Sequence, residues 1–142
     1  MPSADKKERI GPISRSVDSL PDQVFEWLGE VLESGEYVAG CFYADILPDG
    51  AFGERWNLLT NRRYLVLAPD TTGAHAEIVT EIPFEEIHGA ETRSYVGSGA
   101  VILKCGDDAR EVARYRLGSR HEAADLCYYL NEAVKGRGKG KA

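Results

Sequence analysis

The chain contains few of the residues that build covalent or metal-bound frameworks. Its 142 residues include three cysteines, three histidines and one methionine. Cys41, Cys105 and Cys127 are widely spaced, and an odd number without paired spacing fits neither a disulfide framework nor a zinc site. We therefore predict three reduced, structural thiols, and we expect no metal and no cofactor.

Long apolar runs are also missing. No stretch approaches the ~20 apolar residues of a membrane-spanning helix. Residues 1–16 are charged and lack the apolar centre of a signal peptide. We expect a cytoplasmic protein.

Positive charge is scarce, with 17 Lys and Arg against 23 Asp and Glu and a formal net charge of −6. Four of the basic side chains lie in residues 135–142, so residues 1–134 are more acidic still. This balance disfavours nucleic acid or an anionic membrane as the main partner.

The residues that catalysis requires do not converge in the sequence. None of the histidines, His75, His88 and His121, has a cysteine or carboxylate at ligand or triad spacing. The adjacent carboxylates Glu85 and Glu86 would point apart on a strand. We expect a protein that is not an enzyme.

The middle of the chain has a strong β pattern. Residues 56–59 and 64–67 are apolar and β-prone, and they flank a polar turn at residues 60–63. Asn61 suits the tip, since asparagine tolerates a positive φ and bonds its own backbone. The pattern predicts an antiparallel hairpin.

The remaining elements follow from periodicity and turn residues. We predict a flexible arm at 1–16, and then a helix at 19–34 capped by Ser19, with an apolar stripe that docks on a sheet or a partner. Strands follow within 37–117, at 37–47, 51–60, 63–68, 75–84, 90–96, 100–105 and 110–117. In the fourth strand, Ile78 and Ile82 are expected to face inward. Gly97-Ser98-Gly99 is predicted to form a turn, residues 119–134 a helix with a capping box from Ser119 and Glu122, and 135–142 a disordered basic tail. Residues 17–134 would thus form one domain.

Four features in order carry a resemblance to a known family. They are Thr60-Asn61-Arg62-Arg63 before an apolar run, the Ile82-Pro83 link leading to Ile87, the glycine turn near residue 98 and the capped last helix. Together they resemble bacterial pleckstrin-homology-like (GRAM-type) domains over residues 33–134. The resemblance implies a mainly β barrel of seven antiparallel strands in two near-orthogonal sheets, plugged by the C-terminal helix; the N-terminal helix is an addition. A lipocalin-like barrel, the main competitor, would need more strands.

The predicted function is a non-catalytic interaction or scaffold domain that binds protein and self-associates through sheet edges. The resemblance implies homo-oligomeric rings in bacterial members. The first strand lacks Lys and Pro before Pro48, and its outward row is uncharged. The candidate interface is therefore Tyr37, Ala39, Cys41 and Tyr43. The N-terminal helix could instead cover this row within one chain.

The alternative function is a peripheral membrane or lipid-headgroup module anchored by the basic tail. Eukaryotic pleckstrin-homology domains hold phosphoinositides with basic residues on the first hairpin, whereas here that hairpin offers mainly acids around Arg55. The candidate contacts for anionic lipid are Arg62, Arg63, Arg93, Arg114 and Arg116. A solvated face with acids paired to these arginines is the competing interpretation.

Overall fold

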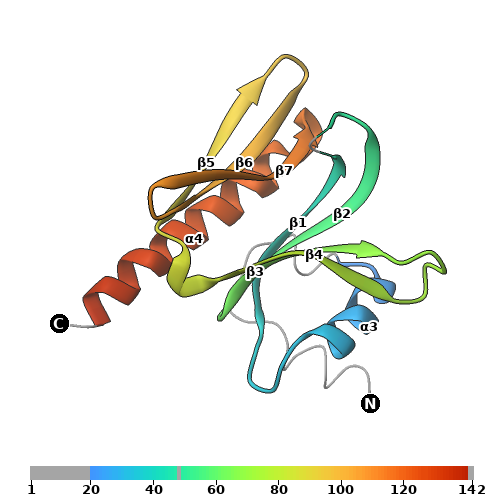
Figure 1. Cartoon of the computed structure of the whole chain (residues 1–142), viewed down its shortest axis with the longest axis horizontal. Coiled ribbons are helices and arrows are strands. Elements are labelled where there is room, and N and C mark those ends of the chain that lie inside the picture. The colour runs from blue at the N-terminus through green and yellow to red at the C-terminus, as the bar shows by residue number, and fades with distance from the viewer. Residues whose placement is uncertain (1–19, 48, 141–142) are drawn as a thin grey trace.

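The structure, a computed structural model, describes residues 20–47 and 49–140. It contains seven antiparallel strands between two helices (Figure 1). Their bounds are α3 (Asp22–Val31), β1 (Val38–Ile46), β2 (Phe52–Thr60), β3 (Arg63–Pro69), β4 (Ala76–Pro83), β5 (Gly89–Tyr95), β6 (Ser98–Cys105), β7 (Asp108–Arg116) and α4 (Arg120–Gly140). Short 3-10 turns, η1 (Phe84–Glu86) and η2 (Leu117–Ser119), precede β5 and α4. The mainly β class and the seven strands are confirmed, and the predicted arm at 1–16 lies outside the described residues.

All seven strands belong to one sheet, in the order β4-β3-β2-β1-β7-β6-β5. The prediction of two sheets is therefore wrong, because β1 joins both groups of strands. It pairs with β2 along most of its length and with β7 at Ile46–Arg114. The sheet does not close into a barrel, and its edges are β4 and β5. The first strand, where we predicted an open edge, is central.

Two apolar cores lie on opposite faces of β1, β2 and β3. The α4 core includes Phe42, Leu59, Tyr64, Val66 and Leu126. The α3 core is made of Leu20, Val24, Trp27, Leu28, Leu32, Val38, Cys41, Leu58, Leu65 and Leu67. Successive side chains of a strand point to opposite faces, so the continuous apolar run at 64–67 supplies both cores in turn. In Figure 1, α3 and α4 accordingly lie on different sides of these strands.

Helix α3 is shorter than predicted. It follows Pro21 and ends at Val31, because Leu32 already has an extended backbone (φ −75°, ψ 140°). The predicted cap, Ser19, lies outside the described residues. Val24, Trp27 and Leu28 are buried against the sheet, so the apolar stripe docks within the chain.

Helix α4 is longer than predicted and continues past Val134 to Gly140. The structure describes residues 135–140 as helical, whereas we predicted that 135–142 form a disordered tail. No proline interrupts this segment, Lys135 pairs with Glu132 at 3.2 Å, and cations near a helix C-terminus interact favourably with its dipole. At the other end, Oε2 of Glu122 is buried without a hydrogen-bond partner in the described chain. That oxygen does not make the predicted capping-box bond.

The β2–β3 turn and the β5–β6 turn both differ from the prediction. Asn61 does not adopt a positive φ. Its side chain instead accepts a hydrogen bond from the Tyr37 amide at 2.8 Å and donates to the Gly35 carbonyl at 3.2 Å. Between β5 and β6 the turn is Val96-Gly97, with Gly97 at φ +76°. Gly99 lies within β6, where an added Cβ would come within 2.6 Å of the Tyr115 ring.

Candidate interaction surface

Arg63, at the start of β3, makes a buried ion pair with Glu36 in the segment that links α3 to β1. Its Nε donates to Oε2 of Glu36 and one Nη to Oε1, both at 2.8 Å. The same guanidinium reaches Oε2 of Glu81 on β4 at 2.9 Å and the Val31 carbonyl at 3.0 Å. Thr60 also donates to Glu36, at 2.6 Å. One arginine thus joins the end of α3, the approach to β1, and β4.

The ionisation of this pair is set by its partners. Burial alone would raise the pKa of Glu36, but the hydrogen bonds from Arg63, Thr60 and the Glu33 amide outweigh it and lower that pKa. Hydrogen bonding to Glu36 raises the pKa of Arg63, against the opposing effect of burial. Both groups are therefore charged and mutually satisfied. Arg63 does not offer its guanidinium to an external anion.

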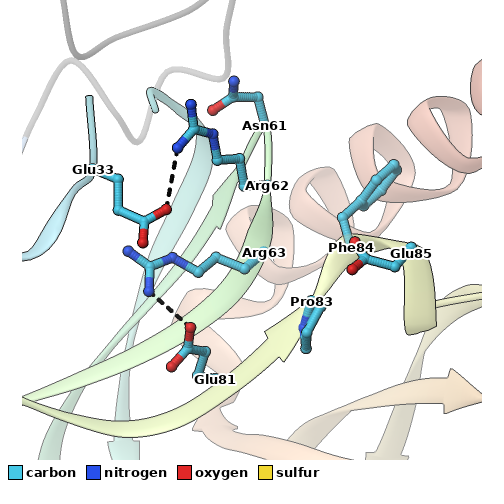
Figure 2. Close-up of a pocket in the computed structure, with 8 residues that line it drawn as sticks. All are labelled: Glu33, Asn61, Arg62, Arg63, Glu81, Pro83, Phe84 and Glu85. Carbon is cyan, nitrogen blue, oxygen red and sulfur yellow. Dashed lines mark hydrogen bonds and ion pairs between the residues drawn. The ribbon is translucent and has the colours of Figure 1, made fainter. Parts of the chain in front are cut away.

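A hollow of about 400 Å³ lies beside this ion pair (Figure 2). Figure 2 shows Arg62 turned toward Glu33 and Arg63 turned toward Glu81, and these pairs measure 3.1 and 2.9 Å. Arg62 also donates to the Ser34 carbonyl at 2.7 Å. The remaining wall comes from Asn61, Pro83, Phe84 and Glu85. With three glutamates against two arginines, the hollow does not favour an anionic ligand.

An apolar groove of about 280 Å³ shares Asn61 and Phe84 with this hollow. Its other lining residues are Tyr37, Ala39, Leu59, Thr60, Tyr129 and Ala133. The groove therefore lies between the start of β1, the β2–β3 turn and α4. The two depressions adjoin at the end of the molecule where β4 runs into η1.

The predicted interface row on the first strand is not a continuous surface. Cys41 is buried in the α3 core, whereas Tyr43 is exposed and packs at a tilt against Trp56, with ring centroids 4.9 Å apart and the ring planes at 53°. Tyr37 and Ala39 are half-buried in the apolar groove. A shift in register between Val38 and Gly40 breaks the alternation on which the prediction rested. The internal cover that we considered, from the N-terminal helix, holds for Cys41.

The predicted basic stripe is neutralised by acids. Arg93 lies 3.6 Å from Glu91. Arg114 pairs with Glu111 at 3.0 Å and lies over the Tyr95 ring. Arg116 pairs with Asp45 at 2.8 Å and lies over the Phe52 ring. The register brings Arg93 and Arg114 to the two sides of Ala100, so the residues do share a face, but each one has an acidic partner.

The unpaired edge of β4 exposes two neighbouring aliphatic side chains. Ile78 is 43% exposed and Val79 49%. The pairing of β3 with β4 shifts between Val66 and Leu67, opposite these residues. Ile78 was predicted to face inward, so its exposure corrects that prediction. Consecutive residues on a regular strand point to opposite faces, so Ile78 and Val79 could not both face the same core. Their adjacency in the sequence could therefore have indicated that an aliphatic side chain of this strand is exposed.

The described residues hold no group of three or more His, Cys, Asp or Glu side chains placed to bind a metal ion. His75 pairs with Glu30, at 2.8 Å, and not with a nucleophile. Within the ranges the structure describes, neither helix combines the length and apolar character needed to cross a bilayer.

No family model matches the chain, and no curated protein matches it significantly. One solved structure is similar, that of a DUF1696 family protein with a pleckstrin-homology domain from Shewanella loihica PV-4. It is 14% identical, the match covers 81% of this chain and 90% of that chain, and the TM-score is 0.46.

Proposed function

We propose that this protein is a non-catalytic, cytoplasmic interaction domain that self-associates through the unpaired edge of β4. The observation that carries the proposal is the pair of exposed aliphatic side chains, Ile78 and Val79, on a strand that ends an open sheet. An unpaired strand edge offers backbone donors and acceptors to another chain, and exposed aliphatic side chains add apolar area to that contact.

The two edges of the sheet differ in how well they are protected. Strand β5 carries Glu91 and Arg93, which are charged and largely exposed. Strand β4 contains no Lys or Arg, and one of its two glutamates, Glu81, contacts Arg63, which also pairs with Glu36. Charged side chains, lysine above all, are a common protection of natural edges. Pro83 and the register shift opposite Ile78 and Val79 protect part of the β4 edge as well, so the choice of β4 rests on its exposed aliphatic pair.

The order of the elements supports a pleckstrin-homology-like domain, with seven antiparallel strands followed by a helix. Such a domain suits binding rather than catalysis. We do not extend the proposal to lipid headgroups, because Arg62, Arg63, Arg93, Arg114 and Arg116 are each paired with a carboxylate.

Static light scattering tests the proposal. The wild-type chain, with a mass of 15.6 kDa, should give a multiple of that mass. Ile78→Lys should lower the mass toward one chain, since a charge at the pairing edge would be desolvated. Val96→Lys is the matched control, because Val96 is fully exposed on the β5–β6 turn, away from β4. Circular dichroism checks that both variants fold. A monomeric wild-type protein at high concentration would contradict the proposal.

A further inference from the structure

A third and smaller hollow lies between β4 and β7. Its volume is about 100 Å³, and its apolar wall includes Ala44, Val66, Val79 and Ala113. Three of these side chains, Ala44, Val66 and Ala113, belong to the α4 core. The hollow is therefore a recess in the face of the sheet that packs against α4. It shares no lining residue with the apolar groove or with the hollow beside the Arg63–Glu36 pair.

Among the described residues, two arginines of this recess have no carboxylate partner. Arg55 and Arg110 both line it. Among the described residues, neither forms an ion pair with a carboxylate, whereas the five arginines considered above all do. Arg55 donates from Nη1 to the Glu54 carbonyl at 2.9 Å. The recess thus holds two arginines that have no ion-pair partner among the described residues.

The glutamates that adjoin these two arginines in the sequence accept hydrogen bonds from other residues. Glu111 also lines the recess, but its carboxylate accepts a hydrogen bond from Arg114 at 3.0 Å. The Glu54 carboxylate accepts one from the Trp56 indole at 2.9 Å. Among the described residues, neither Glu54 nor Glu111 forms an ion pair with Arg55 or Arg110, and Glu111 is paired with Arg114 instead.

A buried polar group next to the recess is also incompletely satisfied. Asn57 follows Arg55 by two positions on β2, so the two residues share a face. It is paired across the sheet with Val66, a residue of the recess wall. Its Oδ1 accepts a hydrogen bond from the Tyr64 hydroxyl at 2.7 Å, but its buried Nδ2 has no partner in the described part of the chain. Unpaired buried donors are uncommon in native proteins.

We propose that this recess binds a short aliphatic carboxylate, with Arg55 and Arg110 holding the carboxylate and the apolar wall holding the alkyl group. Guanidinium groups recognise carboxylates through charge-assisted hydrogen bonds. A cavity of about 150 Å³ accommodates benzene, so 100 Å³ suits a ligand of about four or five non-hydrogen atoms. The carboxylate can belong to a free short-chain acid or to the C-terminus of a peptide.

NMR titration of the ¹⁵N-labelled full chain with sodium propionate tests the proposal, with sodium chloride as the ionic-strength control. Propionate should cause saturable shifts at the amides of Ala44, Val66 and Ala113. Neutral propionamide, which has nearly the same shape, should not. N-acetyl-Ala-Ala, compared with its C-terminal amide, distinguishes the two sources. Tighter binding of the dipeptide than of propionate identifies a peptide terminus, and weaker binding identifies a free acid.

Substitutions assign the binding to the two arginines. Arg55→Gln and Arg110→Gln should each raise the dissociation constant about tenfold or more, since each removes a hydrogen bond to a charged group. Arg93→Gln removes the same charge from an exposed arginine outside the recess and should leave the constant within about twofold. The absence of saturable shifts, equal binding of propionamide, tighter binding of inorganic phosphate, or equal effects of all three substitutions would overturn the proposal.

Discussion

The guanidinium of Arg63 and the carboxylate of Glu36 form two parallel hydrogen bonds of 2.8 Å, although the residues are 27 positions apart. The Glu36 side chain is completely buried and that of Arg63 is 9% exposed. The pair joins the β2–β3 hairpin to the segment that links α3 to β1. Its geometry is bidentate, and Thr60 and the Glu33 amide satisfy further positions on the carboxylate.

Arg63→Ala should destabilise the fold far more than Arg62→Ala. The first substitution leaves the buried Glu36 carboxylate without its cation, which costs about 3–5 kcal/mol. The second removes an exposed pair with Glu33, which contributes about 0–1 kcal/mol. Chemical denaturation of both variants measures the difference in the free energy of unfolding. Similar losses for the two neighbouring arginines would contradict the assignment of Arg63 as the buried partner.

The Glu36 carboxylate should also make stability depend on pH in the acid range. Its pKa in the folded chain lies below the ordinary value of 4.5. Its contribution to stability is therefore complete above about pH 4.5 and is lost as the pH falls through the folded-state pKa. Unfolding free energies measured between pH 3 and 6 should fall more steeply for the wild type than for Glu36→Gln. Parallel pH profiles would show that Glu36 is not the group responsible.

Leu126 connects α4 to the sheet. It is fully buried in the α4 core, beside Leu130 and Ala123. Leu126→Ala should cost about 2–5 kcal/mol through lost burial and a residual cavity. Tyr128→Ala is the control, since Tyr128 is 61% exposed on the same helix. An unchanged denaturation midpoint for Leu126→Ala would mean that α4 does not hold this core together.

The three thiols should differ in reactivity. Cys41 and Cys127 are buried, and burial raises the pKa of Cys127 to about 12. Cys105 is half-buried, and burial raises its pKa as well. With Ellman's reagent at pH 8, at most Cys105 should react in the native protein, and all three should react in denaturant. Rapid reaction of three thiols in the native state would contradict the described burial.

Local pattern was enough to predict most elements, because apolar periodicity and turn residues are local. The buried stripe of α4, with Leu126 and Leu130, is confirmed. Residues 64–67 were correctly predicted to form a strand. Their burial on both faces of the sheet, however, depends on α3 and α4, which are distant from each other in the sequence. The continuity of the sheet depends on the single pairing of Ile46 with Arg114, which no local pattern shows.

The surface was harder to predict than the fold. Two register shifts, near Val38 and near Leu67, change which side chains share a face. One-residue irregularities of this kind move side chains from one face of a strand to the other, so Val38 packs in the α3 core and Ile78 is exposed. Cys41 is buried for a different reason, because α3 covers its face of the sheet. The ion partners of the arginines could not be predicted for a related reason. Glu36, for example, reaches Arg63 only after the hairpin packs against the segment that precedes β1.

Concentration-dependent amide hydrogen exchange of β4 tests the central claim, self-association at this edge, most directly. We predict that amides of β4 (Ala76–Pro83) exchange more slowly in a concentrated solution than in a dilute one, because a second chain pairs with them. Amides at the centre of the sheet, in β1 (Val38–Ile46), should exchange equally in both solutions. Exchange in β4 that is independent of concentration, across a range in which the wild-type mass changes, would contradict the claim.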